Sequence, residues 1–486
     1  MQKTASLKWN FLMNTILTVS SFIFPLITFQ YASRVILPTG IGKVQLATSF
    51  VAYFTMISQL GIPIYGIRAC AKVRDDPAEL SCVARELLMI SGMMTVLAYA
   101  VLGICIACIP RVHEERALYM LMSSSILLTA LGMEWLSKGI EAYTFITVRS
   151  LVFKVIALAA LFLLVRDEGD YLFYGLVCVI ASSGSFIWNF LAVQKHLRVK
   201  PKRKYDLSRH KKPILIFFAM TCATTIYTNL DNVMLGFMTN DASVGIYSAA
   251  VNIRNILVAV VTSLGAVLLP RASYYIEHKK DDAFYEISAK ACHFVVLLAV
   301  PLWVYFTVYA RLGILFLSGE AYLEATTSIR LLMPTLLMIG LTNIMGIQML
   351  VPLGREKAVL YSVLAGAVTD LVLNTALIPV YREVGAAIGT LAAEIVVFVF
   401  QYRILSDRLS AVFRKTAYWK ILAALVIASA ASFRLASLPY SYLLLLVLTA
   451  VVFMAVYGGV LWILKEPLAL EIIDSARQFV RQHIKR

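Results

Sequence analysis

An acid and a base lie inside an apolar stretch of the chain, YTNLDNVMLGFMTNDASVGIYSAAVNIRNIL, which covers residues 227–257. Its pattern predicts two helices joined by a short polar turn near Asp241, with Asp231 on the first helix and Arg254 on the second. Helical rise places both side chains about 15–20 Å from the turn, at a similar depth on neighbouring helices. Two hypotheses follow. Either the residues form a buried ion pair, or Arg254 binds an anionic group while Asp231 tunes it or carries a coupling proton or cation.

Composition places the helices that carry these charges in a membrane. Of 486 residues, 60% are hydrophobic and only 15% are charged. A soluble domain of this size has too little interior to bury so much apolar surface. Apolar segments of about 20 residues, the length that crosses a bilayer, recur along the whole chain. The sequence therefore predicts an all-α polytopic membrane protein with about fourteen transmembrane helices.

The net charge is +16, and the distribution of the basic residues indicates the membrane topology rather than a surface that binds nucleic acid. Basic residues concentrate in alternate loops, most of all in KHLRVKPKRKYDLSRHKKP at residues 195–213. By the positive-inside rule, both termini are expected in the cytoplasm. We expect no nucleic-acid partner.

The predicted loops are too short for a catalytic domain on either side of the membrane. The phosphate-binding pattern G-x-x-x-x-G-K-[ST] does not occur in the sequence. Cys105 and Cys108 have the spacing of metal ligands but lack a second Cys or His pair, so we expect them to pack as small apolar residues. The protein is accordingly expected to be no enzyme and to have no metal or cofactor, with a proton or a sodium ion as the candidate coupling ion.

A faint internal repeat relates the two halves of the chain. IGKVQLA at residues 41–47 and VGIYSAA at residues 244–250 share a branched residue, a glycine and an alanine, and glycine-containing segments follow both at similar spacing. Parallel repeats predict two pseudo-symmetric six-helix lobes around a central cavity. The predicted parts are an N-lobe with spans 1–6 (1–197), a basic cytoplasmic connector (198–212), a C-lobe with spans 7–12 (213–406), spans 13 and 14 (407–464) and a cytoplasmic tail (465–486).

Other polar residues within the predicted spans are candidates for binding a substrate together with Asp231 and Arg254. They are Asn232, Tyr247, Asn252, Arg34, Arg68, Arg149, Lys154, Asp370, Asn374 and Glu394. The basic residues of spans 1, 2 and 5 lie within reach of a membrane interface, where contact with headgroups is at least as good an explanation. Asn374 and Glu394 could instead hydrogen-bond between helices.

Four segments resemble a known family. SRVILPTGIGKVQLATSFVAYFTMISQLGIPIYGIRACAKVRDD (33–76), EWLSKGIEAYTFITVRSLVFKV (134–155), YTNLDNVMLGFMTNDASVGIYSAAVNIRNI (227–256) and AGAVTDLVLNTALIPVYREVGAAIGTLAAEI (365–395) occur in the order of its spans. They are similar to the polysaccharide transporter family of oligosaccharide-repeat-unit flippases, in the multidrug/oligosaccharidyl-lipid/polysaccharide exporter superfamily.

The resemblance implies a function in the bacterial inner (cytoplasmic) membrane. A flippase of this family moves undecaprenyl-diphosphate-linked oligosaccharide repeat units to the outer leaflet by alternating access, for O-antigen (lipopolysaccharide), capsule or exopolysaccharide. Membrane lipids, a polysaccharide polymerase and a chain-length regulator are the other candidate partners. The alternatives are a cation-coupled multidrug exporter of the same architecture and a lipid II flippase. A polysaccharide polymerase or membrane glycosyltransferase would normally need a sizeable outer loop, which the sequence lacks.

Overall fold

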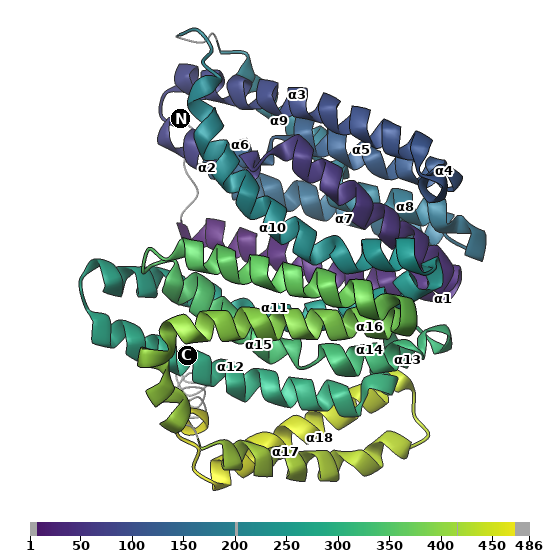
Figure 1. Ribbon diagram of the computed structural model, residues 1–486, viewed down its shortest axis with the longest axis vertical. Coiled ribbons are helices and arrows are strands. Elements are labelled where there is room, and N and C mark those ends of the chain that lie inside the picture. Colours follow the sequence, from purple (N-terminus) through teal and green to yellow (C-terminus); the bar gives the residue numbers. More distant parts are fainter. Residues whose placement is uncertain (1–6, 200–202, 416, 472–486) are drawn as a thin grey trace, which may run out of the picture. The chain divides into compact units, whose positions relative to one another are not determined.

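The computed structural model describes residues 7–199, 203–415 and 417–471. Helices make up most of these residues, and no strand occurs among them. The chain divides into two compact units, unit 1 (Met1–Ser248) and unit 2 (Ala249–Arg486), which Figure 1 colours along the sequence. Residues 200–202 of the predicted connector and residues 472–486 of the predicted tail lie outside the described residues.

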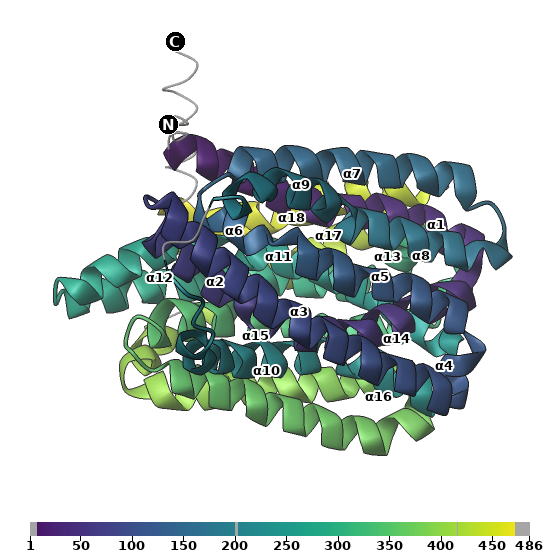
Figure 2. The same cartoon turned by 90° about the horizontal axis from the view of Figure 1, so that it is seen from above.

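Several long helices of unit 1 pack against α1. Figure 2 shows several of them, among them α1, α3, α5 and α7, running along a common direction. The elements are α1 (Leu7–Gln59), α2 (Ile62–Lys72), α3 (Pro77–Cys108), α4 (Pro110–Glu114), α5 (Arg116–Gly132), α6 (Glu134–Gly139), α7 (Tyr143–Leu164), a 3₁₀ turn (Glu168–Asp170), α8 (Tyr171–Val179), a π turn (Ile180–Gly184), α9 (Ser185–Leu197), α10 (Ser208–Met238) and the start of α11 (Asp241–Glu277).

Unit 2 continues from α11 and ends in a pair of packed helices, α17 and α18. Its elements are α12 (Asp281–Val308), α13 (Ala310–Leu317), a 3₁₀ turn (Glu320–Tyr322), α14 (Ala325–Leu332), α15 (Thr335–Thr342), a π turn (Asn343–Leu350), α16 (Glu356–Lys415), α17 (Tyr418–Phe433), a 3₁₀ turn (Arg434–Ser437) and α18 (Tyr442–Ile463).

Twelve helical segments in the described part of the chain are long and apolar enough to cross a membrane. Two of them, Leu12–Lys72 with 61 residues and Glu356–Asp407 with 52 residues, are long enough for two crossings each. Each also contains a non-helical residue, Leu37 with φ 55° and Arg382 with φ 49°. Two crossings in each account for the fourteen predicted helices, and the prediction of an all-α polytopic membrane protein is confirmed.

The break in α1 has a cause in the sequence. Leu37 directly precedes Pro38, and the proline ring disfavours helical dihedrals in the residue before it. Pro38 also has no N–H to continue the helical hydrogen bonds. The break therefore separates the helix before Leu37 from the helix that follows it.

The boundary between the two units lies within α11, after Ser248, whereas the sequence places the lobe division at the connector 198–212. The helix that follows the connector, α10, packs against α1 and α2, which explains why it belongs to unit 1. The predicted lobes therefore stay a prediction.

The two copies of the repeated glycine motif meet each other inside unit 1. A Cβ on Gly42 would lie 1.7 Å from the backbone oxygen of Asp241, and a Cβ on Gly245 would lie 2.0 Å from the backbone oxygen of Pro38. These spacings are far below van der Waals contact, so only glycine allows the two backbones to approach this closely. The repeat that is visible in the sequence thus marks a close crossing of α1 and α11.

A buried carboxylate fixes the start of α10. Glu86 on α3 is fully buried and pairs with Arg203 Nη1 at 2.7 Å and Arg209 Nη2 at 2.6 Å, and it lies 2.9 Å from His210 Nε2. Burial opposes the charge of Arg203, but the hydrogen bonds to Glu86 outweigh this effect and raise the pKa of the guanidinium. This network holds the helix that carries Asp231 against α3.

Candidate functional site

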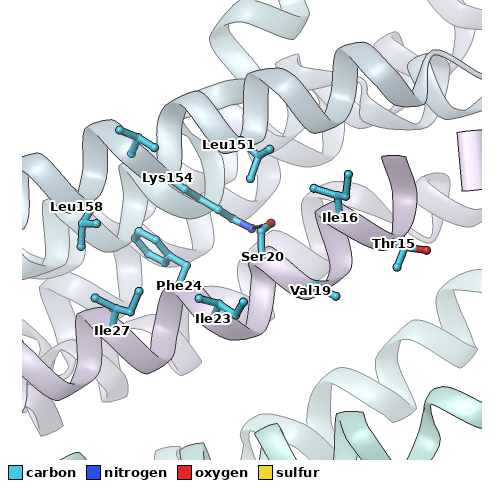
Figure 3. A pocket seen from close by; sticks show the side chains of 11 residues that line it. Thr15, Ile16, Val19, Ser20, Ile23, Phe24, Ile27, Leu151, Lys154 and Leu158 are labelled. Atoms are coloured by element: carbon cyan, nitrogen blue, oxygen red, sulfur yellow. Dashed lines mark hydrogen bonds between the residues drawn. The ribbon is translucent and has the colours of Figure 1, made fainter. Parts of the chain in front are cut away.

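A groove lies in unit 1 between the first half of α1 and the middle of α7 (Figure 3). Its volume is about 390 Å³. The lining residues, which define the α1–α7 groove, are Thr15, Ile16, Val19, Ser20, Ile23, Phe24, Ile27, Leu151, Lys154, Val155 and Leu158. On both helices they recur at intervals of three or four residues, which places them along one helix face.

Lys154 is the one charged residue of the groove, at the middle of α7. Its Nζ donates hydrogen bonds to Ser20 Oγ at 2.8 Å and to Ser21 Oγ at 3.0 Å. Both hydroxyls in turn donate to the backbone oxygen of Leu17. An ammonium has three donors, and no carboxylate pairs with this one among the residues that the structure describes. Within the described part of the chain, Lys154 is thus a half-buried positive charge without a compensating negative one.

Arg149, on the same helix, differs from Lys154 because a carboxylate pairs with it. Its side chain is 1% exposed, and it donates to Glu134 Oε2 at 2.7 Å and to Ser185 Oγ at 2.9 Å. The guanidinium also lies over the ring of Phe186, with 5.3 Å between Cζ and the ring centroid. Lys138 pairs with the second oxygen of Glu134 at 2.7 Å. This charge is compensated inside the protein, which indicates a structural role for Arg149.

Substituting Glu134 with glutamine should destabilise unit 1 strongly. The change leaves the buried Arg149 without its counter-charge, and breaking a buried ion pair from one side costs about 3–5 kcal/mol. Thermal unfolding of the purified protein in detergent would measure the loss. Lys138→Ala is the matched control, because the Lys138 side chain is 34% exposed and should contribute little. Equal unfolding temperatures for Glu134→Gln and wild type would contradict the structural role.

Asp231 and its predicted neighbours lie on α10 and the first turns of α11. Tyr247 is almost fully buried and donates a hydrogen bond from Oη to Asp231 Oδ2. Asn232 is also buried and donates from Nδ2 to Ser49 Oγ of α1 at 3.1 Å. The structure therefore brings Asp231, Asn232 and Tyr247 together within unit 1.

Arg254 and Asn252 lie farther along α11, in unit 2, and both are partly exposed. Arg254 donates from Nη2 to Asn255 Oδ1 at 3.1 Å and from Nε to the same atom at 3.4 Å. Because Asp231 and Arg254 belong to different units, both hypotheses for this pair stay predictions.

The two remaining basic candidates are exposed. Arg34 on α1 donates from Nη1 to the backbone oxygen of Gln30 at 2.8 Å. Arg68 on α2 lies over the ring of Phe217, with 5.1 Å between Cζ and the ring centroid. These contacts fit side chains that extend along the protein surface, as the interfacial alternative expects.

The polar candidates of unit 2 form a buried strip in α16. Asp370, Asn374 and Glu394 are 1%, 0% and 6% exposed. A Cβ on Gly389 would lie 2.2 Å from Asn374 Oδ1 and 2.9 Å from Asp370 Oδ1, so Gly389 is the residue that lets the two halves of α16 approach here. Gln401 Nε2, at one end of the strip, donates to Ser362 Oγ at 2.9 Å.

Sequence reasoning missed Ser20, Ser21, Gly389 and Gln401. Serine and glycine are frequent in transmembrane helices, so their types alone carry no signal. A useful signal for Ser20 would have been its position on the same apolar face as Ile16 and Ile23.

The fold and these charges define a class, a multi-pass, all-helical membrane protein with ionisable groups inside its spans. The family model described as "Polysaccharide biosynthesis protein" matches residues 7–276, more than half of the chain, and the chain belongs to this family. A second model, MatE, matches residues 216–376. The family predicted from the sequence is confirmed.

Relatives and a solved structure agree with this assignment. The "Putative O-antigen transporter" of Escherichia coli (strain K12) is 22% identical over 406 residues, which cover 81% of this chain and 95% of the relative. The protein of the same name from Shigella dysenteriae is 24% identical over 415 residues, 82% of this chain and 99% of the relative. The structure titled "Lipid II flippase MurJ, inward closed conformation" has a TM-score of 0.70 at 15% identity and covers 93% of this chain and 98% of that one. This last likeness shows a shared fold.

Proposed function

We propose that the protein flips lipid-diphosphate-linked oligosaccharides from the cytoplasmic to the outer leaflet of the bacterial inner membrane. The family and the names of the two relatives support a role in surface-polysaccharide assembly. The observation that carries the proposal is Lys154, an ammonium midway along a membrane helix whose partners among the described residues are two neutral hydroxyls. The proposed counter-charge is the substrate.

A diphosphate supplies the chemistry that such a cation lacks. Moving a bare anion through hydrocarbon costs many kcal/mol, and the cost falls when charge-assisted hydrogen bonds replace its water. Lys154 can serve as a point charge for a phosphate, and the planar guanidinium of Arg254 can bind two phosphate oxygens at once. In this proposal the two cations meet the diphosphate at different stages of an alternating-access cycle.

Energy for directional transport requires a coupling ion, and acids inside the spans are the candidates. Asp231 accepts a hydrogen bond from Tyr247 in unit 1, and Asp370 and Glu394 are buried in α16 of unit 2. A carboxylate in such surroundings binds either a proton or a sodium ion. The ion and the predicted polymerase and chain-length regulator stay part of the proposal.

A multidrug exporter of the same architecture is the second candidate, because the MatE model matches part of the chain. Exported drugs of this kind are commonly cationic, and an uncompensated ammonium such as Lys154 would repel them. The substrate of a lipid II flippase would present the same diphosphate to Lys154. The sugar on the substrate therefore distinguishes the two kinds of flippase. Lys154 therefore favours a lipid diphosphate over a cationic drug.

Deleting the protein from its host cell tests the proposal. We expect loss of surface polysaccharide and accumulation of lipid-linked repeat units on the cytoplasmic leaflet, with unchanged sensitivity to cationic drugs. Labelling intact membranes with a membrane-impermeant reagent before the lipids are extracted would show in which leaflet the repeat units lie. Unchanged surface polysaccharide together with increased drug sensitivity would support the exporter instead.

A further inference from the structure

The α1–α7 groove combines apolar walls with a single ammonium. Its walls are large apolar side chains that recur along one face of α1 and meet the middle of α7 (Figure 3). Some of them are open to the surroundings: Ile23 is 50% exposed and Val155 is 67% exposed. An open apolar channel of this kind accommodates a hydrocarbon chain.

The depth of Lys154 restricts which lipid can satisfy both parts of the groove. The residue lies at the middle of α7, Tyr143–Leu164, and is therefore about 15 Å from either interface of a typical bilayer. Headgroups of resident phospholipids stay at the interface, so their phosphates do not reach it, whereas the phosphate of a lipid that the protein moves between leaflets must pass this depth. An acyl chain from the bilayer would fill the groove but would leave the ammonium unpaired.

We infer that the α1–α7 groove binds the hydrocarbon chain of the lipid carrier where the chain joins its phosphate, with Lys154 as the phosphate contact. The ligand is a polyprenyl phosphate or diphosphate, a long apolar chain that ends in an anion. The inference rests on the proposed function and adds to it that unit 1 recognises the carrier rather than the sugar.

The two serines give the site its shape. Ser20 and Ser21 accept two hydrogen bonds from Lys154 Nζ, and this holds the ammonium over α1 rather than letting it extend to an interface. One donor of the ammonium is left for the phosphate. Because every contact in this arrangement is to the chain or to the phosphate, a carrier without any sugar should bind to the groove.

Binding of a sugar-free polyprenyl phosphate to the purified full-length protein in nanodiscs tests the inference. Ile23→Trp and Val19→Trp should each fill the groove from α1 and weaken binding roughly tenfold or more. Ile156→Trp is the matched control, because Ile156 is 46% exposed on α7 but does not line the groove. It should bind as the wild type does. Phosphatidylglycerol added in excess should not displace the probe.

Three results would overturn the inference: wild-type binding by both groove variants, equal loss in Ile156→Trp, or equal displacement of the probe by phosphatidylglycerol. The last would identify an ordinary bilayer-lipid site. Failure of the proposed function looks different. In that case the wild-type protein would not flip a sugar-linked carrier in liposomes. If instead Ile23→Trp and Val19→Trp flipped the carrier as fast as the wild type, the groove assignment would be wrong and the proposed function would stand.

Discussion

Lys154→Ala should strongly reduce surface polysaccharide while the protein is still inserted and folded. A charge-assisted hydrogen bond is worth about 1.5–3 kcal/mol, so its loss from the transport step corresponds to a roughly 10- to 100-fold lower rate. Folding should survive, because the ammonium bonds only to two hydroxyls and removing it leaves no buried charge unpaired. The measurement is surface polysaccharide per molecule of membrane-inserted protein.

Two variants separate the charge of Lys154 from its packing. Lys154→Arg keeps a cation in the groove and should retain part of the transport, whereas Lys154→Met keeps the length of the side chain and should lose as much transport as Lys154→Ala. Ser20→Ala with Ser21→Ala should weaken transport less than Lys154→Ala, because the ammonium itself remains. Full export by Lys154→Met would contradict the assignment of a phosphate contact.

Arg254→Ala should also abolish export, and Arg254→Lys should rescue it poorly. A lysine preserves the charge but loses the planar fork that binds two phosphate oxygens. The protein should again be inserted normally, since the hydrogen bonds of Arg254 go to the neighbouring Asn255. Asn255→Ala is the matched control and should export at close to the wild-type level.

A double substitution decides what Asp231 does for Arg254. If the two residues form a structural pair, Asp231→Asn together with Arg254→Gln should restore the transport that each single variant loses. If Arg254 binds the diphosphate, the double variant should be as inactive as Arg254→Ala. Normal export by Arg254→Ala alone would refute the substrate role directly.

The helices could be predicted because their signals are local. Runs of apolar residues define the spans, and Pro38 defines the break in α1. The repeat that contains Gly42 and Gly245 is visible in the sequence, but the close crossing of its two copies is known only from the structure. The unit boundary in α11 could not be predicted, since it depends on the packing of α10 against α1.

The roles of the charges were harder to predict from the sequence. Arg149 and Lys154 lie five residues apart on one helix. The sequence offers the same two explanations for both residues, binding of a substrate and contact with lipid headgroups. Only the fold shows that Glu134, on a different helix, neutralises Arg149, while Lys154 meets two serines from α1. Whether a buried charge is structural or available to a ligand depends on partners that are distant in the sequence.

The central claim is transport of a lipid diphosphate, and flipping in reconstituted liposomes tests it most directly. A lipid-diphosphate oligosaccharide with a fluorescent label on its sugar would be placed in both leaflets, and a membrane-impermeant quencher added outside. With wild-type protein the fluorescence should fall well below half of its starting value, as inner-leaflet lipid reaches the quencher. With no protein it should stop near half, and with Lys154→Ala the fall below half should be roughly 10- to 100-fold slower than with the wild type. A wild-type trace that also stops near half, in intact vesicles with folded protein and under proton and sodium gradients, would contradict the account.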